Sequence, residues 1–162
     1  MQELTKDLLL ELMVECEACE ESFDYVNSQE TIEDVIAFAG YHYTFFFLSN
    51  YPEYSYLLPK GLDWYKSNRF ILTDLLIKQP QFAAKCDFSI LNGYNIASLL
   101  SKQPQLSTYC DLDKLEGINW RVLLTNQPQF AVYCPWSKLD SQDKSRLREE
   151  QPQLFVKHAK KH

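Results

Sequence analysis

Apolar and polar positions recur together with a period of 24 residues through the later part of the chain. The tripeptide Gln-Pro-Gln begins at four positions 24 residues apart, namely Gln79, Gln103, Gln127 and Gln151. Apolar columns keep the same step: Phe82, Leu106, Phe130 and Leu154; Leu75, Leu99, Leu123 and Leu147; and Leu91, Leu115 and Leu139. Because several columns stay in register, the pattern indicates a tandem repeat.

Two further columns set the limits of the repeated region. One contains Cys86, Cys110, Cys134 and then His158, and the other contains Trp64, Phe88, Leu112 and Trp136. The tripeptide Tyr51-Pro52-Glu53 is a degenerate version of the repeat start. We therefore expect a repeat array over 51–150, and a partial repeat with a basic tail over 151–162.

Each unit predicts a short helix, a turn and a second helix. Pro80 suits the first position of a helix, where its missing N–H costs nothing. A helix over Pro80–Cys86 would place Phe82 and Cys86 on one face, and Asp87 would start a single 3₁₀ turn. Gln103 must be the joint to the next unit, because a residue before proline is disfavoured in the helical region.

The second helix of a unit is predicted from its glycine and its capping residue. Gly93 would permit a reversal of the backbone. Asn95 would then cap a helix that begins at Ile96, with Asn119 and Asp143 in the equivalent positions. Two short helices cannot bury their apolar faces alone, so neighbouring units must stack. The sequence predicts an all-α fold: a short α-solenoid of about four 24-residue helical repeats with an N-terminal helical cap.

The repeat resembles a known one. Its string Gln-Pro-Gln-Phe-Ala…Cys-Asp…Leu-x-Gly…Asn-Trp…Leu-Leu is similar to a tandem repeat of uncharacterised bacterial proteins, whose unit is QPQFA-x-x-CDWSKL-x-G-x-x-W-x-x-LL. The unit length is also similar to that of leucine-rich repeat variant proteins, which are helical solenoids. The resemblance covers about residues 51–162 and implies a bacterial or phage protein, but no activity. The last unit departs from it at Pro135, Ser141 and Arg148.

Residues 1–50 lack the repeat and are strongly acidic. Thr5 can cap a helix that runs to about Glu21, with one apolar stripe made of Leu9, Leu12, Met13, Cys16 and Cys19. Thr31 and Asp34 have the spacing of a capping box, and Tyr41–Asn50 reads as another helix after Gly40. We expect this segment to be a helical cap of the same domain, because no Pro/Gly/Ser linker follows it.

Charge and composition limit the cellular compartment and the class of protein that the sequence allows. The net charge of −6 hides an excess of ten acidic residues in 1–40, against a charge of +4 in the remainder. Aromatic residues make up 14%, which argues against disorder, and four glycines leave no Gly-rich phosphate loop. The longest apolar run, Tyr41–Leu48, is too short to span a bilayer. Five cysteines without a disulfide framework favour a reducing, cytoplasmic setting.

No pattern of catalytic or metal-binding residues stands out. The single Cys16-x-x-Cys19 falls on an apolar stripe, which favours two buried thiols over a redox or zinc site. The flanking glutamates would raise the pKa of these thiols. Rungs of the cysteine column would lie roughly 10 Å apart, too far for one zinc ion. The three histidines, His42, His158 and His162, accompany no catalytic motif. We therefore expect no catalytic residue, metal, cofactor or small-molecule substrate.

Binding of a protein partner is the function that this pattern favours. Solenoids offer extended surfaces, and an inhibitor or immunity-type protein would use one in this way. The residues before the cysteine column, Lys85, Tyr109, Tyr133 and Lys157, would form one edge, with Arg121 on the same side. The acidic arm, with Glu15, Glu17, Glu20 and Glu21, is the competing site.

Two alternatives involve nucleic acid. Aromatic residues next to basic ones, such as Trp120 and Arg121, could stack on bases, and the acidic arm could mimic a phosphate backbone. The absence of a dense basic stripe argues against nucleic acid as a partner. Salt dependence of binding would separate the alternatives.

Overall fold

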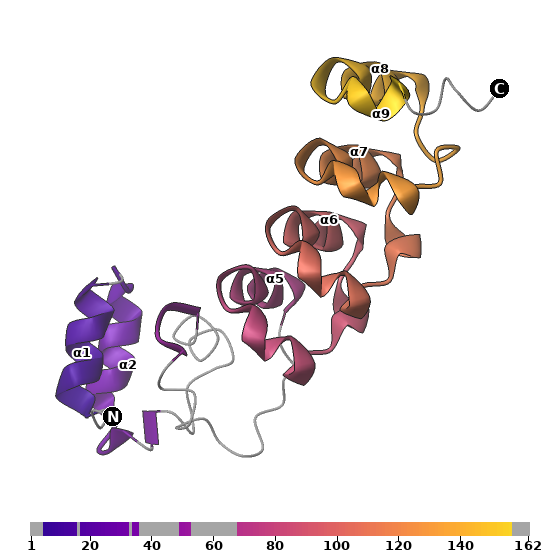
Figure 1. The fold of residues 1–162 in the computed structure, drawn as a ribbon. Helices are drawn as coiled ribbons and strands as arrows, with labels where there is room; N and C mark the ends of the chain where they lie inside the picture. Colours follow the sequence, from indigo (N-terminus) through magenta and orange to yellow (C-terminus); the bar gives the residue numbers. More distant parts are fainter. Residues whose placement is uncertain (1–4, 16, 33, 36–48, 53–67, 157–162) are drawn as a thin grey trace. The chain divides into compact units, whose positions relative to one another are not determined.

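The chain divides into two compact units, Met1–Ser67 and Asn68–His162 (Figure 1). The computed structural model describes residues 5–15, 17–32, 34–35, 49–52 and 68–156. Over these ranges the regular structure is entirely helical and contains no strand, which confirms the all-α class. No helix in the same ranges is long and apolar enough to cross a membrane.

The first unit contains a helical pair where one long helix was expected. α1 (Lys6–Glu15) begins after Thr5, whose Oγ1 accepts a hydrogen bond from the Leu8 N–H at 3.2 Å. The helix does not continue to Glu21, because Glu17 takes the left-handed conformation with φ 54° and α2 (Glu20–Ser28) starts anew. The turn lets Leu9 and Met13 bury themselves against Val26 and Val35 of the following segment. One straight helix would leave that apolar stripe in water.

Polar contacts close the helical pair. Lys6 Nζ donates to the carbonyls of Asn27 and Gln29 at 3.0 and 2.6 Å, so a cation lies at the C-terminal end of α2, where the helix dipole favours it. Thr31 Oγ1 accepts from the Asp34 N–H at 3.1 Å, as the capping pattern predicts. The expectations for Gly40, for most of 41–50, for Trp64 and for the basic tail from Lys157 fall outside the described residues.

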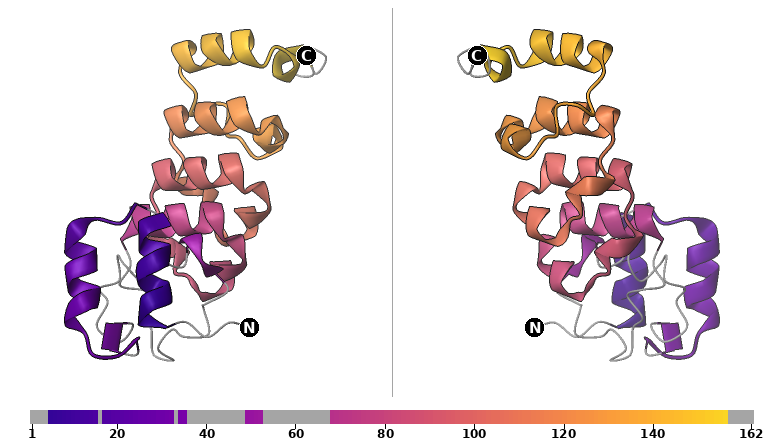
Figure 2. Two further views of the ribbon diagram at one scale, coloured as in Figure 1. Left: turned by 90° about the vertical axis from the view of Figure 1, so that its left-hand side faces the viewer. Right: turned by 90° about the vertical axis from the view of Figure 1, so that its right-hand side faces the viewer.

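The second unit is built on four ten-residue helices that begin 24 residues apart. They are α5 (Arg69–Lys78), α6 (Gly93–Lys102), α7 (Gly117–Asn126) and α8 (Ser141–Glu150). Each contacts the next, and they stack with nearly parallel axes (Figure 2). The Leu75, Leu99, Leu123 and Leu147 column is fully buried between them. Polar α8 buries only Leu147, which suits an end of the stack facing water.

Between the long helices the chain forms short 3₁₀ segments rather than α-helix. They are η3 (Pro80–Lys85), η5 (Pro104–Tyr109) and η7 (Pro128–Val132), with the shorter η4 (Phe88–Ile90) and η6 (Leu112–Lys114), while α9 (Gln153–Val156) takes the last such place. Runs of five or six residues are short enough for the tighter i→i+3 pattern, which is common in brief connecting segments. The predicted turn at Asp87 is confirmed, because Asp87 Oδ1 accepts from the Ser89 N–H at 2.8 Å.

The starts of the long helices differ from the prediction. α6 begins at Gly93, three residues before Ile96, and Asn92 rather than Asn95 is its cap. Gly93 does not have a positive φ, so it does not serve a reversal. A Cβ at this glycine would instead collide with the Lys114 carbonyl and approach Asn119 Oδ1 to 2.6 Å. Glycine is therefore required because the next unit packs against the backbone.

In the last three Gln-Pro-Gln tripeptides, the first glutamine bonds back to the long helix that lies one unit before the preceding one. Gln103, Gln127 and Gln151 donate through Nε2 to the carbonyls of Ile77, Ser101 and Thr125 at 2.5, 2.9 and 2.6 Å. These carbonyls lie in the last turns of α5, α6 and α7, where the helix offers them no N–H. The Oε1 of each glutamine accepts from the glutamine two residues later. The repeated motif is thus a side-chain ladder that fixes the register between units.

A second ladder uses lysine. Lys114 Nζ donates to the carbonyls of Ser89 and Leu91 at 2.7 and 3.0 Å. Lys138 makes the same pair of bonds one unit later, to Asp113 and Leu115 at 2.8 and 2.9 Å. Both ammonium groups therefore tie the turn that carries them to the 3₁₀ turn one unit earlier.

Candidate partner-binding surfaces

The predicted tyrosine edge lies at the ends of successive 3₁₀ segments. Lys85 ends η3, Tyr109 ends η5, and Tyr133 directly follows η7. Tyr109 is 46% exposed and Tyr133 is 65% exposed. The structure therefore brings these three sequence-predicted residues to equivalent places, as their 24-residue spacing implies. The fourth member, Lys157, lies outside the described residues.

Each of these side chains also covers an apolar ring. The Tyr109 ring stacks on Phe88, with centroids 5.2 Å apart and planes 21° apart. The Tyr133 ring lies tilted against Phe130 at 6.2 Å, and Lys85 Nζ lies 5.8 Å from the centroid of Phe82. One side of each residue thus protects the core and the other faces solvent, so covering the core and offering a surface are compatible roles.

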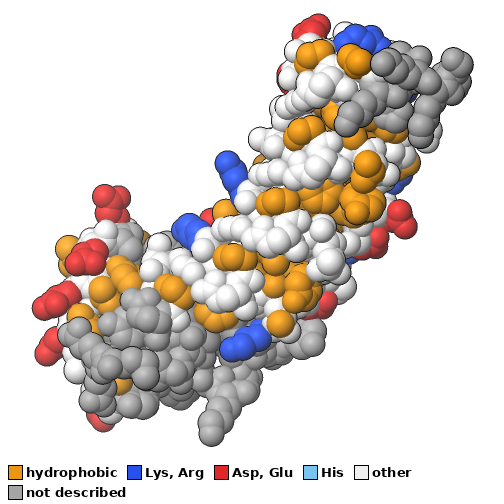
Figure 3. Space-filling view, viewed as in Figure 1, with side chains coloured by type: hydrophobic (Ala, Val, Ile, Leu, Met, Phe, Trp, Pro, Cys, Tyr) orange, Lys and Arg blue, Asp and Glu red, His pale blue; other side chains and the backbone are white. Residues whose placement is uncertain are grey.

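Two valines extend this edge and were missed from the sequence. Val132 is 82% exposed and Val156 is 63% exposed. They occupy equivalent positions two residues after Phe130 and Leu154, so the repeat register could have found them. We use "3₁₀ edge" for Lys85, Tyr109, Val132, Tyr133 and Val156. Figure 3 shows apolar side chains recurring along the stacked units.

Arg121 links two helices of the stack. Its Nε donates to Asp143 Oδ1 at 3.1 Å, and the two side chains are only 16% and 14% exposed. The pair joins α7 to α8. Arg121 is therefore tied down by a neighbouring carboxylate, whereas the sequence suggested only that it lies on the side of the tyrosine edge.

The residues that suggested base stacking are largely committed to the fold. Trp120 is 1% exposed and lies in the apolar core, so its ring cannot stack on a base. Trp136 is half-buried and meets Phe155 edge-on at 5.6 Å. Lys114 and Lys138 bond to backbone carbonyls. Trp120 is therefore not available to stack on a base, whereas Tyr109 and Tyr133 are exposed.

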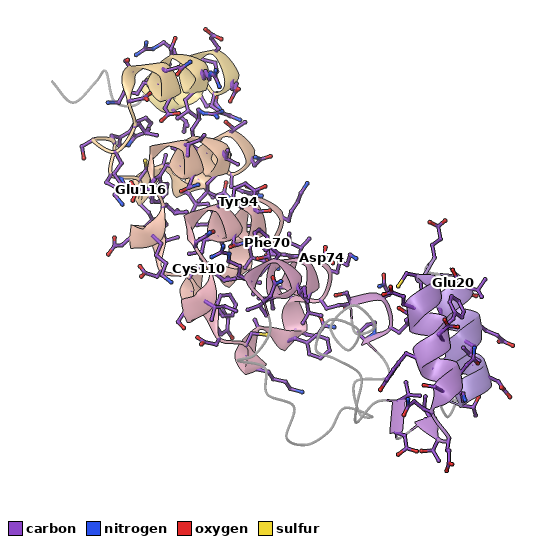
Figure 4. All side chains as sticks on the ribbon, turned by 180° about the vertical axis from the view of Figure 1, so that it is seen from behind. Glu20, Phe70, Asp74, Tyr94, Cys110 and Glu116 are labelled. Atoms are coloured by element: carbon purple, nitrogen blue, oxygen red, sulfur yellow. The ribbon has the colours of Figure 1, made fainter. Side chains whose placement is uncertain are left out.

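The four glutamates proposed as an acidic site all lie exposed in the first unit. Glu15 ends α1, Glu17 lies in the turn, and Glu20 and Glu21 begin α2 (Figure 4 labels Glu20). Carboxylates in the first turn of a helix stabilise it through the dipole. Glu20 and Glu21 thus have a local structural role in addition to any binding role.

The cysteines separate into two environments. Burial raises the pKa of Cys86 and Cys110 to about 12 and that of Cys134 to about 11, so these thiols stay protonated at neutral pH. Cys19 is exposed and caps α2, so the expectation that it is buried is wrong. Its pKa is lowered by hydrogen bonds from Ser22, which outweigh the opposing effect of Glu21. Cys16 lies outside the described residues.

A second exposed apolar set lies on the long helices. Phe70, Tyr94 and Ile118 are the second residues of α5, α6 and α7, and Figure 4 labels the first two on their neighbouring helices. The sequence reasoning missed them because it followed only the columns of core residues. We call Phe70, Tyr94, Ile118 and the neighbouring Val122 the "helix stripe".

Neither metal-binding chemistry nor similarity to known proteins assigns a function to these surfaces. Within the described ranges, no group of three or more His, Cys, Asp or Glu side chains is placed to hold a metal ion. No family model, curated protein or solved structure matches this chain.

Proposed function

We propose that the chain is a short cytoplasmic α-solenoid of about four 24-residue repeats with an N-terminal helical cap. We further propose that it binds another protein through the 3₁₀ edge and catalyses no reaction. An inhibitor or an immunity-type protein acts in this way. The supporting features are the 24-residue recurrence of the long helices, the two side-chain ladders and the composition of the exposed edge.

The single observation that carries the proposal is the exposure of Tyr109, Val132, Tyr133 and Val156 on successive segments. Val132 contributes almost nothing to the core at 82% exposure, so packing alone does not account for an apolar residue there. Exposed apolar side chains are typical of interaction sites, and tyrosine is enriched at them.

Charge favours a protein partner over nucleic acid. Residues 68–156 contain ten Lys and Arg against nine Asp and Glu. Three of those cations, Lys114, Arg121 and Lys138, are engaged in bonds within the fold. A surface that neutralises phosphates needs several free cations along one face.

Affinity capture from the native host tests this function. The bait is the full chain, compared with a Val132→Asp, Tyr133→Ser double variant. Val14→Asp is the matched control, because Val14 is 66% exposed but belongs to the first unit. We expect one protein to be captured by the wild type and by the control, and lost with the edge variant, while all three baits keep the same melting temperature.

Two results would reject the proposal. One is an identical set of captured proteins with and without the edge substitutions. The other is capture of nucleic acid, shown by nuclease-sensitive binding to random DNA or RNA. The logarithm of that binding constant would fall linearly with the logarithm of the salt concentration.

A further inference from the structure

The helix stripe has the spacing and exposure of a docking site. Phe70, Tyr94 and Ile118 are 56%, 67% and 59% exposed, and each is the second residue of its helix. Val122 lies one turn along α7 from Ile118 and is also exposed. We infer that the helix stripe binds one amphipathic α-helix of a partner protein, which crosses α5, α6 and α7 and carries a large apolar residue at every seventh position. The inference rests on the proposed protein-binding function but concerns a different surface.

The spacing of the stripe favours a helix over a β-strand. Packed helices lie 8–10 Å apart, so successive stripe residues are separated by roughly 10 Å. Residues seven apart in an α-helix are about 10.5 Å apart and lie on the same face within about 20°. In a strand, residues on one face are about 7 or 13 Å apart, and neither distance matches. A helix with a heptad pattern can therefore meet all three rungs in register, which a β-strand cannot.

Charges at the two ends of the stripe set the direction of the bound helix. Arg69 directly precedes Phe70, and its guanidinium lies 5.3 Å from the centroid of that ring. Exposed Glu116 precedes Ile118 by two residues, at the cap of α7. Asp74 is already paired with Lys78 at 3.1 Å. A partner helix is complementary when an acidic C-terminal end lies over Arg69 and a basic N-terminal end lies near Glu116, because opposite charges then meet. The partial charges of the helix ends, negative at the C-terminus and positive at the N-terminus, act in the same sense.

The size of the stripe argues against a second copy of the chain as the occupant. Two half-exposed aromatic rings with an isoleucine and a valine offer on the order of 400 Å² of apolar surface. A stable protein–protein interface needs about 800 Å² from each partner. One helix of three to four turns, held by a few apolar anchors, matches the smaller area.

Synthetic peptides test the inference on the full chain. The first is a 21-residue helical peptide with leucine at positions 3, 10 and 17, arginine near its N-terminus and glutamate near its C-terminus. The second has the same composition with leucine at positions 3, 8 and 13. The third keeps the heptad and exchanges the two charged ends. Binding is measured by fluorescence anisotropy.

Substitutions at the second helical position give a clean variant and a matched control. Tyr94→Asp removes the central anchor, and an aspartate in the first turn is favoured by the helix dipole, so the fold is kept. Gln142→Asp makes the same change at the equivalent position of α8, beyond the stripe. Circular dichroism melting checks that both variants fold.

We expect the heptad peptide to bind about tenfold or more tightly than the peptide with altered spacing. Tyr94→Asp should abolish this preference, while Gln142→Asp should leave it intact. The charge-exchanged peptide should associate more slowly at low salt. Equal binding of the first two peptides, or no binding of the heptad peptide up to about 1 mM, would overturn the inference. The Val132→Asp, Tyr133→Ser variant can lose its captured protein whatever the peptides do. Failure of this inference is therefore distinguishable from failure of the proposed function.

Discussion

Replacing Gln127 by glutamate changes one atom of the glutamine ladder and should weaken the stack. In the native protein Gln127 Nε2 donates to the Ser101 carbonyl at 2.9 Å, and Gln127 Oε1 accepts from Gln129 Nε2 at 2.7 Å. A carboxylate has the same shape and can still accept from Gln129. It cannot donate to Ser101, and its charge would face a carbonyl oxygen. The substitution therefore isolates the donor half of the ladder.

The expected loss of stability follows from the half-buried position of this bond. Leaving a buried polar group unsatisfied costs about 1–3 kcal/mol, and more when a charge is involved. The carbonyl belongs to the last turn of α6 and has no intrahelical donor, so water must replace the lost bond. We expect Gln127→Glu to lower the free energy of unfolding by about 1–3 kcal/mol at pH 7.

The pH dependence of the loss has a definite sign. Proximity to the carbonyl disfavours the ionised form, so the pKa of the introduced carboxyl lies above its ordinary value of about 4.3. Below that raised pKa the protonated group regains an O–H donor. The destabilisation is therefore fully present at neutral pH and diminishes as the pH falls through the raised pKa.

Urea unfolding followed by far-UV circular dichroism measures this difference at pH 7 and at pH 4.5. Gln142→Glu, an exposed change in the first turn of α8, is the control and should alter stability by less than about 1 kcal/mol. If Gln127→Glu matches this control at pH 7, or if its loss does not shrink in acid, the ladder does not hold the units together.

Four other expectations concern packing and the burial of thiols. Gly117→Ala should lower the melting temperature by several degrees, because its Cβ would meet the Lys138 carbonyl at 2.5 Å; an unchanged value would contradict the close approach. Phe130→Ala should cost about 3–5 kcal/mol in urea unfolding, as deletion of a buried phenyl ring does, and a loss under about 1 kcal/mol would argue against its place in the core. Alkylation at pH 8, mapped by peptide mass spectrometry, should modify Cys19 well before Cys110, whose thiol has a pKa of about 12; comparable rates would refute the burial. Because the folded pKa of Cys110 is raised, its contribution to stability is complete below about pH 8.5 and is lost as the pH rises toward 12, so Cys110→Ala should flatten the alkaline fall in stability measured between pH 9 and 11.

The sequence by itself determined the helical class, the joints and the spacing of the second unit. Proline at the second place of each Gln-Pro-Gln ends one helix and starts the next segment through its own covalent geometry, whatever surrounds it. The buried columns, such as Phe82 and Phe130, follow from periodicity alone, because equivalent positions in stacked units share an environment. For the same reason Tyr109 and Tyr133 are both exposed at the ends of successive 3₁₀ segments.

Only the tertiary structure decided which role each polar or small residue takes. Gln103 reads as a joint in the sequence, yet its amide reaches a carbonyl 26 residues earlier, a contact that no local pattern encodes. Gly93 reads as a turn residue, but its requirement comes from the neighbouring unit. The sequence pattern predicts one helix through Glu17, but the chain turns there. The turn is favoured because folding back buries Leu9 and Met13. Periodicity reports which face of a segment is apolar, whereas partners and exposure depend on what packs against that face. That is why the ion pair of Arg121 with Asp143 and the helix stripe were both missed.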